Sequence, residues 1–63
     1  MPIIQVHLLE GRTTDQKRKL VANLTEAVVK SLDAKPDAVR IILHEMARPN
    51  YAIAGVLTVD KQG

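Results

Sequence analysis

Two strand-like segments separated by one amphipathic helix constrain the fold of this chain more than any other feature. Residues 3–9 alternate as expected of a strand, and residues 39–46 form the most hydrophobic segment. Between them, residues 20–32 carry apolar side chains at helical spacing, after a start at Thr13 with Gln16 in capping-box register. The order strand, helix, strand predicts a β-α-β unit with parallel strands and a right-handed crossover.

One face of this predicted two-stranded sheet has no helix to cover it. Ile4, Val6 and Leu8 share one face and are expected to meet the helix, whereas the opposite face carries other apolar residues, Ile3 and Ile42 among them. Parallel sheets are normally covered on both sides. A chain of 63 residues is also marginally stable alone, and without cysteine it has no disulfide to stabilise it. We therefore expect the chain to associate with copies of itself.

The C-terminal part of the sequence predicts a short hairpin. Pro49 and Asn50 signal a turn, and two short apolar runs follow, one on either side of Gly55. Such a hairpin has little core to join in so small a domain, so we expect it to reach onto a neighbouring subunit. The predicted fold class is α+β: a single β-α-β unit with parallel strands plus a short C-terminal hairpin, forming one domain over residues 1–63 and assembled as an oligomer.

Composition narrows the partners and the location. The net charge is +2, and Tyr51 is the only aromatic residue, so the stacking surface typical of single-strand binders is missing. We interpret the basic run at residues 17–19 as a solvated helix face. No apolar run approaches the ~20 residues of a membrane span, and the first residues lack the layout of a signal peptide. These features predict a cytoplasmic protein that binds neither nucleic acid nor membrane.

Pro2, Arg12 and Arg40 are the candidate catalytic residues. If Met1 is removed, Pro2 presents a terminal secondary amine, which is a candidate general base or nucleophile, although many chains begin Met-Pro without chemical consequence. Arg12 follows the first strand at a glycine turn, and Arg40 begins the second strand. Taken singly, each arginine is more often a surface or interface ion-pair residue. Together they suit the recognition of carboxylate and carbonyl oxygens.

Several short motifs extend along the chain. They are Pro2 after Met1, Leu-Leu-Glu-Gly-Arg at residues 8–12, Asp15-Gln16-Lys17, Thr25-Glu26-Ala27, Val39-Arg40-Ile41-Ile42, Glu45-Met46 and residues 51–55. With these motifs the chain resembles, over nearly its whole length, the 4-oxalocrotonate tautomerase family, the short homohexameric members of the tautomerase superfamily. The resemblance implies a hexamer built as a trimer of dimers, with no cofactor and no metal. It also implies the conversion of 2-hydroxymuconate-like dienols, which are small dicarboxylates, to conjugated 2-oxo acids.

The resemblance further implies a role for each candidate residue. Pro2 would be the N-terminal proton shuttle, and Arg12 would bind the distal carboxylate of the substrate. Arg40, supplied by a neighbouring subunit, would draw electron density toward the 2-oxo and carboxylate end. Tyr51 takes the position of an aromatic residue that lines the pocket. Nearby guanidinium groups and an apolar wall would lower the pKa of the Pro2 amine, so that it is neutral near pH 7.

Two alternatives stay open at the level of sequence. The chain could instead be a non-catalytic oligomeric module that binds an anion or a partner through its arginines, and blocking the N-terminal amine would then leave binding unaffected. His7 and His44 are less favoured as acid–base groups, because imidazoles on interface strands usually act as hydrogen-bonding groups. The substrate range is also open, because Ala52 and Ala54 replace glycines found in some relatives.

Overall fold

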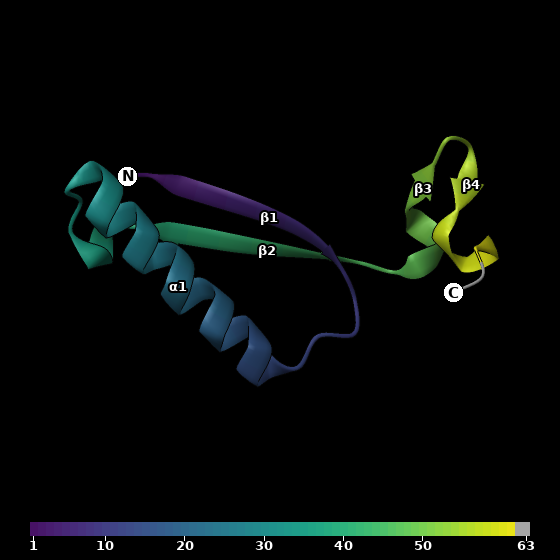
Figure 1. The fold of residues 1–63 in the computed structure, drawn as a ribbon, viewed down its shortest axis with the longest axis horizontal. Helices are drawn as coiled ribbons and strands as arrows, with labels where there is room; N and C mark the ends of the chain where they lie inside the picture. The colour runs from purple at the N-terminus through teal and green to yellow at the C-terminus, as the bar shows by residue number, and fades with distance from the viewer. Residues whose placement is uncertain (62–63) are drawn as a thin grey trace.

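The computed structural model describes residues 1–61, which form a β-α-β unit followed by a separate hairpin (Figure 1). The regular elements are β1 (Ile3–Leu9), α1 (Thr14–Leu32), β2 (Arg40–Met46), β3 (Ala52–Ile53) and β4 (Val56–Leu57). Three short 3₁₀ turns connect or end them: η1 (Pro36–Ala38), η2 (Arg48–Asn50) and η3 (Thr58–Asp60). This order confirms the predicted α+β class.

Strands β1 and β2 pair in parallel, as predicted. The register runs from Ile3 opposite Arg40 to Leu9 opposite Met46. The pairing continues past the end of β1, where the backbone N–H of Glu10 donates to the carbonyl of Met46 over 2.9 Å. Strand β2 begins one residue later than predicted, because the backbone N–H of Val39 closes the preceding 3₁₀ turn.

Helix α1 begins where the capping box predicts. The Thr13 hydroxyl accepts from the backbone N–H of Gln16 over 3.1 Å, and the Gln16 side chain accepts from the backbone N–H of Thr13 over 2.9 Å. Asp33 ends the helix in the left-handed conformation, with φ of 56°. An ion pair of 2.6 Å between Lys17 and Glu45 joins the first turn of the helix to β2. Its half-exposed position makes it a modest contributor to stability.

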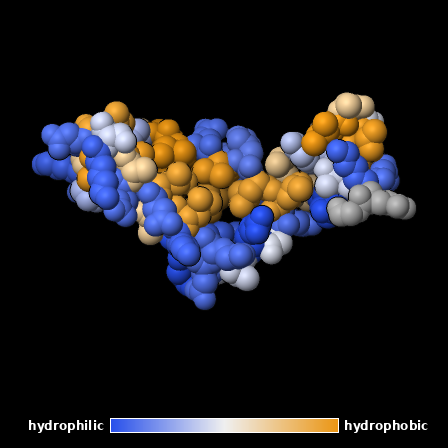
Figure 2. All heavy atoms as spheres, in the orientation of Figure 1, coloured by the Kyte–Doolittle hydropathy of each residue, from blue (hydrophilic) through white to orange (hydrophobic). Residues whose placement is uncertain are grey.

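The sheet face opposite α1 is uncovered. Ile3 and Ile42 are 51% and 44% exposed, and no residue of the described chain is fully buried. His7 and His44, which are register partners, stack with ring centroids 4.6 Å apart on this face. The Nε2 atom of His44 is buried yet has no hydrogen-bond partner among residues 1–61. Figure 2 shows hydrophobic residues gathered across the middle of the molecule. We call the sheet face that carries Ile3, His7, Ile42 and His44 the open face.

The overall dimensions are those of an incomplete folding unit. The Cα radius of gyration is 14.9 Å, whereas a compact domain of this length has one of about 11 Å. The accessible surface is 4965 Å², and a compact monomer of this mass exposes about 4,000 Å². Most of the missing compactness comes from the hairpin, which lies beyond the end of β1 and β2 and away from α1 (Figure 1). No helix of residues 1–61 is both long and apolar enough to cross a membrane.

The hairpin turn is made by two residues with positive φ. Ala54 has φ of 52° and Gly55 has φ of 82°, as a two-residue hairpin of type I′ requires. Ala52 pairs with Leu57, and Ile53 pairs with Val56. Both strands are exposed, so this hairpin has no core of its own within residues 1–61 of one chain. The expectation that it reaches onto a neighbouring subunit stays a prediction.

Candidate functional site

Pro2 and Arg40 lie together at the end of the sheet where both parallel strands begin. The backbone N–H of Arg40 donates to the carbonyl of Pro2 over 3.0 Å. The guanidinium of Arg40 turns back and donates to the carbonyl of Asp37 in η1. The half-buried Pro2 ring therefore sits directly before β1, with an exposed arginine on the adjacent strand.

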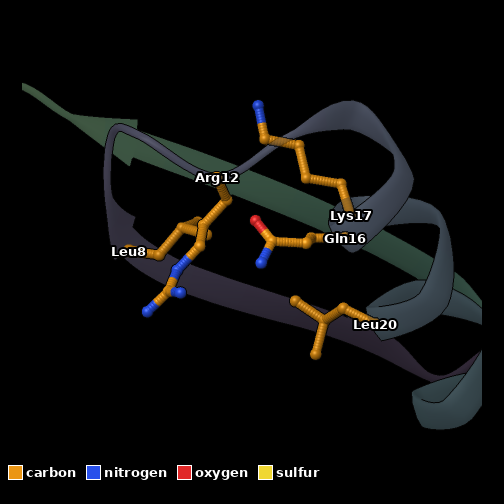
Figure 3. A pocket seen from close by; sticks show the side chains of 5 residues that line it. All are labelled: Leu8, Arg12, Gln16, Lys17 and Leu20. Atoms are coloured by element: carbon orange, nitrogen blue, oxygen red, sulfur yellow. The ribbon is translucent and has the colours of Figure 1, made fainter.

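Arg12 lies at the opposite end of the sheet. Gly11, with φ of 121°, turns the chain out of β1 in a conformation that favours glycine. This turn places Arg12 between the end of β1 and the first turn of α1. Arg12 lines a hollow of about 230 Å³ with Leu8, Gln16, Lys17 and Leu20. In Figure 3 its guanidinium points past Leu8 and away from the ammonium of Lys17.

Arg12 also lines a second, more polar hollow. This hollow has a volume of about 380 Å³. Its lining residues are Leu8, Leu9, Glu10, Gly11, Arg12 and Arg48. Tyr51 lies close by along the chain, at the base of the hairpin, and is 39% exposed. The backbone N–H of Tyr51 donates to the carbonyl of Arg48 over 3.4 Å, which ties the aromatic residue to the turn that carries this arginine.

A single chain therefore does not gather all the predicted site residues. It brings Pro2 to Arg40 at one end of the sheet and Arg12 to Arg48, which precedes Tyr51 by three residues, at the other. The two ends are separated by the seven residues of β1, which at about 3.3 Å per residue span about 20 Å. A site that uses both Pro2 and Arg12 must take them from different copies of the chain.

Arg48 is a charged residue of this region that the sequence analysis did not single out. It follows β2 by two residues, as Arg12 follows β1 by three. The carboxyl ends of parallel strands meet at one edge of the sheet, so the prediction of a parallel pair already placed these two arginines close together. That inference was available from the sequence and was missed.

The arginines of the candidate site are free of carboxylate partners within the described chain. The ion pairs found among residues 1–61 join Lys17 to Glu45, Arg18 to Asp15 and Lys30 to Glu26. None of these pairs involves Arg12, Arg40 or Arg48. Guanidinium groups without a carboxylate keep most of their donors available for an anionic ligand. Both ends of the sheet are thus suited to bind carboxylate oxygens.

Comparison with known proteins places this architecture in a family. Residues 2–61 match the family of tautomerase enzymes. A 2-hydroxymuconate tautomerase of Pseudomonas putida is 47% identical over 57 residues, which cover 90% of each chain. A 4-oxalocrotonate tautomerase isozyme from Methylibium petroleiphilum superposes with a TM-score of 0.90 at 52% identity, covering 92% of this chain and 91% of the other.

A second solved structure extends the comparison to a described assembly. A heterohexamer 4-oxalocrotonate tautomerase from Chloroflexus aurantiacus superposes with a TM-score of 0.92 at 27% identity. The match covers 98% of this chain and 100% of that one. Both parts of the fold, the β-α-β unit and the hairpin, fall within this coverage, and the sequence match spans nearly every residue. The chain belongs to the tautomerase enzyme family.

Proposed function

We propose that this chain is a keto-enol isomerase that converts 2-hydroxymuconate-like dienols to conjugated 2-oxo acids, with Pro2 as the acid–base group. The observation that carries the proposal is that the family match begins at Pro2, which lies half-buried directly before β1 at the start of the sheet. The name of the Pseudomonas putida relative supplies the substrate class. Turnover needs Met1 to be absent, because an amide nitrogen is not basic.

The proposed reaction moves one proton and the electrons of a conjugated chain. The neutral amine of Pro2 takes the proton of the dienol hydroxyl, and that oxygen becomes a carbonyl. The same proton returns to a carbon farther along the chain, which gives the 2-oxo acid without an oxidant, a cofactor or a metal. Arg40 of a neighbouring copy stabilises the charge that develops on the oxygens at the reacting end, and Arg12 binds the distal carboxylate. Tyr51 lines the pocket.

We also propose that the domain, residues 1–63, works as a cytoplasmic homo-oligomer, and specifically as a hexamer made of three dimers. Three observations support self-association. The open face carries the exposed side chains of Ile3 and Ile42 and a buried His44 nitrogen that has no hydrogen-bond partner among residues 1–61. Pro2 and Arg12 lie at opposite ends of β1, so one copy cannot complete the site. The Chloroflexus aurantiacus relative is itself described as a heterohexamer.

The test of the function is a ketonisation assay on 2-hydroxymuconate, using protein whose intact mass shows that Met1 is absent. Pro2→Ala is expected to lower kcat by about 10²-fold or more, because positioned acid–base groups contribute rate factors of this order. Pro36→Ala is the matched control, since it removes a proline from η1 that has no part in the proposed chemistry. Unchanged turnover in Pro2→Ala would defeat the proposal in favour of a non-catalytic anion-binding module.

A further inference from the structure

The polar hollow at the carboxyl ends of β1 and β2 contains two arginines, of which the proposed mechanism uses one. Arg12 reaches it from the turn after β1, and Arg48 reaches it from the turn after β2. The remaining lining residues are Leu8 and Leu9 of β1, followed by Glu10 and Gly11. Two guanidinium groups and one carboxylate therefore line the hollow beside the apolar end of β1.

The charge of this hollow favours an anionic ligand. Glu10 is its one carboxylate, and none of the ion pairs among residues 1–61 involves it. Two guanidinium groups that line one hollow repel each other, and an anion bound between them removes that repulsion. The planar guanidinium is also the side chain best matched to a carboxylate, because it donates two parallel hydrogen bonds.

Arg48 is held in place by the hairpin. Its Nη2 atom donates to the carbonyl of Thr58 over 3.2 Å. The backbone N–H of Thr58 in turn donates to the carbonyl of Tyr51 over 2.8 Å. A guanidinium has five N–H donors, so one bond to Thr58 fixes the orientation of Arg48 and leaves other donors for a ligand. Arg48 thus links the hollow to the aromatic residue of the candidate site.

We propose that Arg48 is a specificity residue that forms, with Arg12, a two-guanidinium subsite for the carboxylate farthest from the reacting end of the substrate. This inference rests on the proposed function and adds to it. A substrate with a second carboxylate gains charge-assisted hydrogen bonds from Arg48, whereas a substrate that ends in a hydrocarbon gains none. Arg48 therefore sets the preference of the enzyme for dicarboxylates over monocarboxylates.

The test compares two substrates in the assembled enzyme. One is 2-hydroxymuconate, and the other is 2-hydroxy-2,4-pentadienoate, which lacks the distal carboxylate. Arg48→Gln is expected to lower the ratio of their kcat/KM values about tenfold, mainly through a higher KM for the dicarboxylate. Arg48→Lys should restore part of the ratio, because it returns the charge without the fork. Arg18→Gln, which removes an exposed arginine on α1, is the matched control and should leave the ratio as it is.

The outcomes separate a specificity role from a structural one. If Arg48 only tethers the hairpin, Arg48→Gln will lower kcat/KM for both substrates by the same factor, and the ratio will stay constant. That result, or an Arg48→Gln enzyme that matches the wild type on both substrates, overturns the proposal.

A binding measurement keeps the inference testable if the proposed function fails. Should the wild-type protein turn over neither substrate, calorimetric titration with adipate and with hexanoate measures the same preference without chemistry. Wild-type protein is expected to bind adipate more tightly, and Arg48→Gln should weaken adipate binding about tenfold more than hexanoate binding. Equal affinities in wild type and variant would overturn the two-guanidinium subsite.

Discussion

Arg40 and Pro2 are joined by a backbone hydrogen bond of 3.0 Å, from the N–H of the arginine to the carbonyl of the proline. This bond belongs to the parallel ladder that continues with Ile3 opposite Arg40. Because the backbone makes the contact, the position of the Pro2 ring does not depend on the Arg40 side chain. Substitutions of that side chain therefore report on its charge with little disturbance of the base.

Arg40→Gln is expected to lower kcat for 2-hydroxymuconate by about 10²-fold, the usual effect of removing one donor from a site of developing charge. KM should change less, because Arg12 still binds the far end of the substrate. Steady-state measurement of kcat and KM checks this expectation. Arg18→Gln is the control for the loss of an exposed guanidinium. A rise in KM alone would show that Arg40 binds the substrate without assisting the reaction.

The state of the first residue is expected to decide activity. Protein that retains Met1 has an amide at Pro2 and should be inactive, and treatment with a methionine aminopeptidase should restore turnover in proportion to the fraction processed. Intact mass spectrometry gives the fraction of chains without Met1, and the ketonisation assay on the same samples gives the turnover. Equal turnover before and after processing would rule out the proline amine as the base.

The separation of Pro2 from Arg12 along β1 leads to a prediction about mixed assemblies. Pro2→Ala chains keep Arg12, and Arg12→Gln chains keep Pro2. If each site takes the two residues from different copies, oligomers re-formed from both variants contain some sites with both residues intact. Ketonisation by the re-formed mixture should then exceed the average of the two parent proteins.

The control for the mixing experiment uses the double variant Pro2→Ala with Arg12→Gln. Oligomers re-formed from Pro2→Ala and this double variant contain no Pro2, so their activity should stay at the parent level. Native mass spectrometry confirms that mixed oligomers have formed. If the first mixture then gains no activity, sites that take Pro2 and Arg12 from different copies do not form.

The elements of this fold are encoded by local sequence signals, and the candidate site depends on contacts beyond them. Alternation predicted β1, the Thr13–Gln16 pair predicted the start of α1, and Gly55 predicted the hairpin turn. Arg48 was missed because a lone arginine before Pro49 has no periodic pattern. Its significance follows from the parallel pairing, which was itself predicted and brings the ends of β1 and β2 to one edge. The site as a whole is less predictable still, because Pro2 and Arg12 can meet only between copies.

The open face is expected to be an interface between copies. Ile42→Asp places a carboxylate on this face, where its desolvation on assembly is costly, so the variant should populate smaller species. Sedimentation velocity at a fixed protein concentration measures the change. Asn23→Asp adds the same charge at an exposed position of α1 and should leave the assembly as it is. An unchanged Ile42→Asp assembly would show that copies associate elsewhere.

Substitutions in the hairpin turn separate the cost of a left-handed backbone from the cost of a steric clash. A Cβ added at Gly55 would meet no atom of its own chain within 4 Å, so within one chain Gly55→Ala has the cost of the left-handed backbone, about 1 kcal/mol. Ala54→Gly, at φ of 52°, releases the same kind of strain in the neighbouring residue and should be neutral or stabilising. Thermal unfolding at matched protein concentration compares the two, because the midpoint of an oligomer depends on concentration. If Gly55→Ala unfolds at the wild-type temperature, the turn contributes little to the stability of the assembled protein.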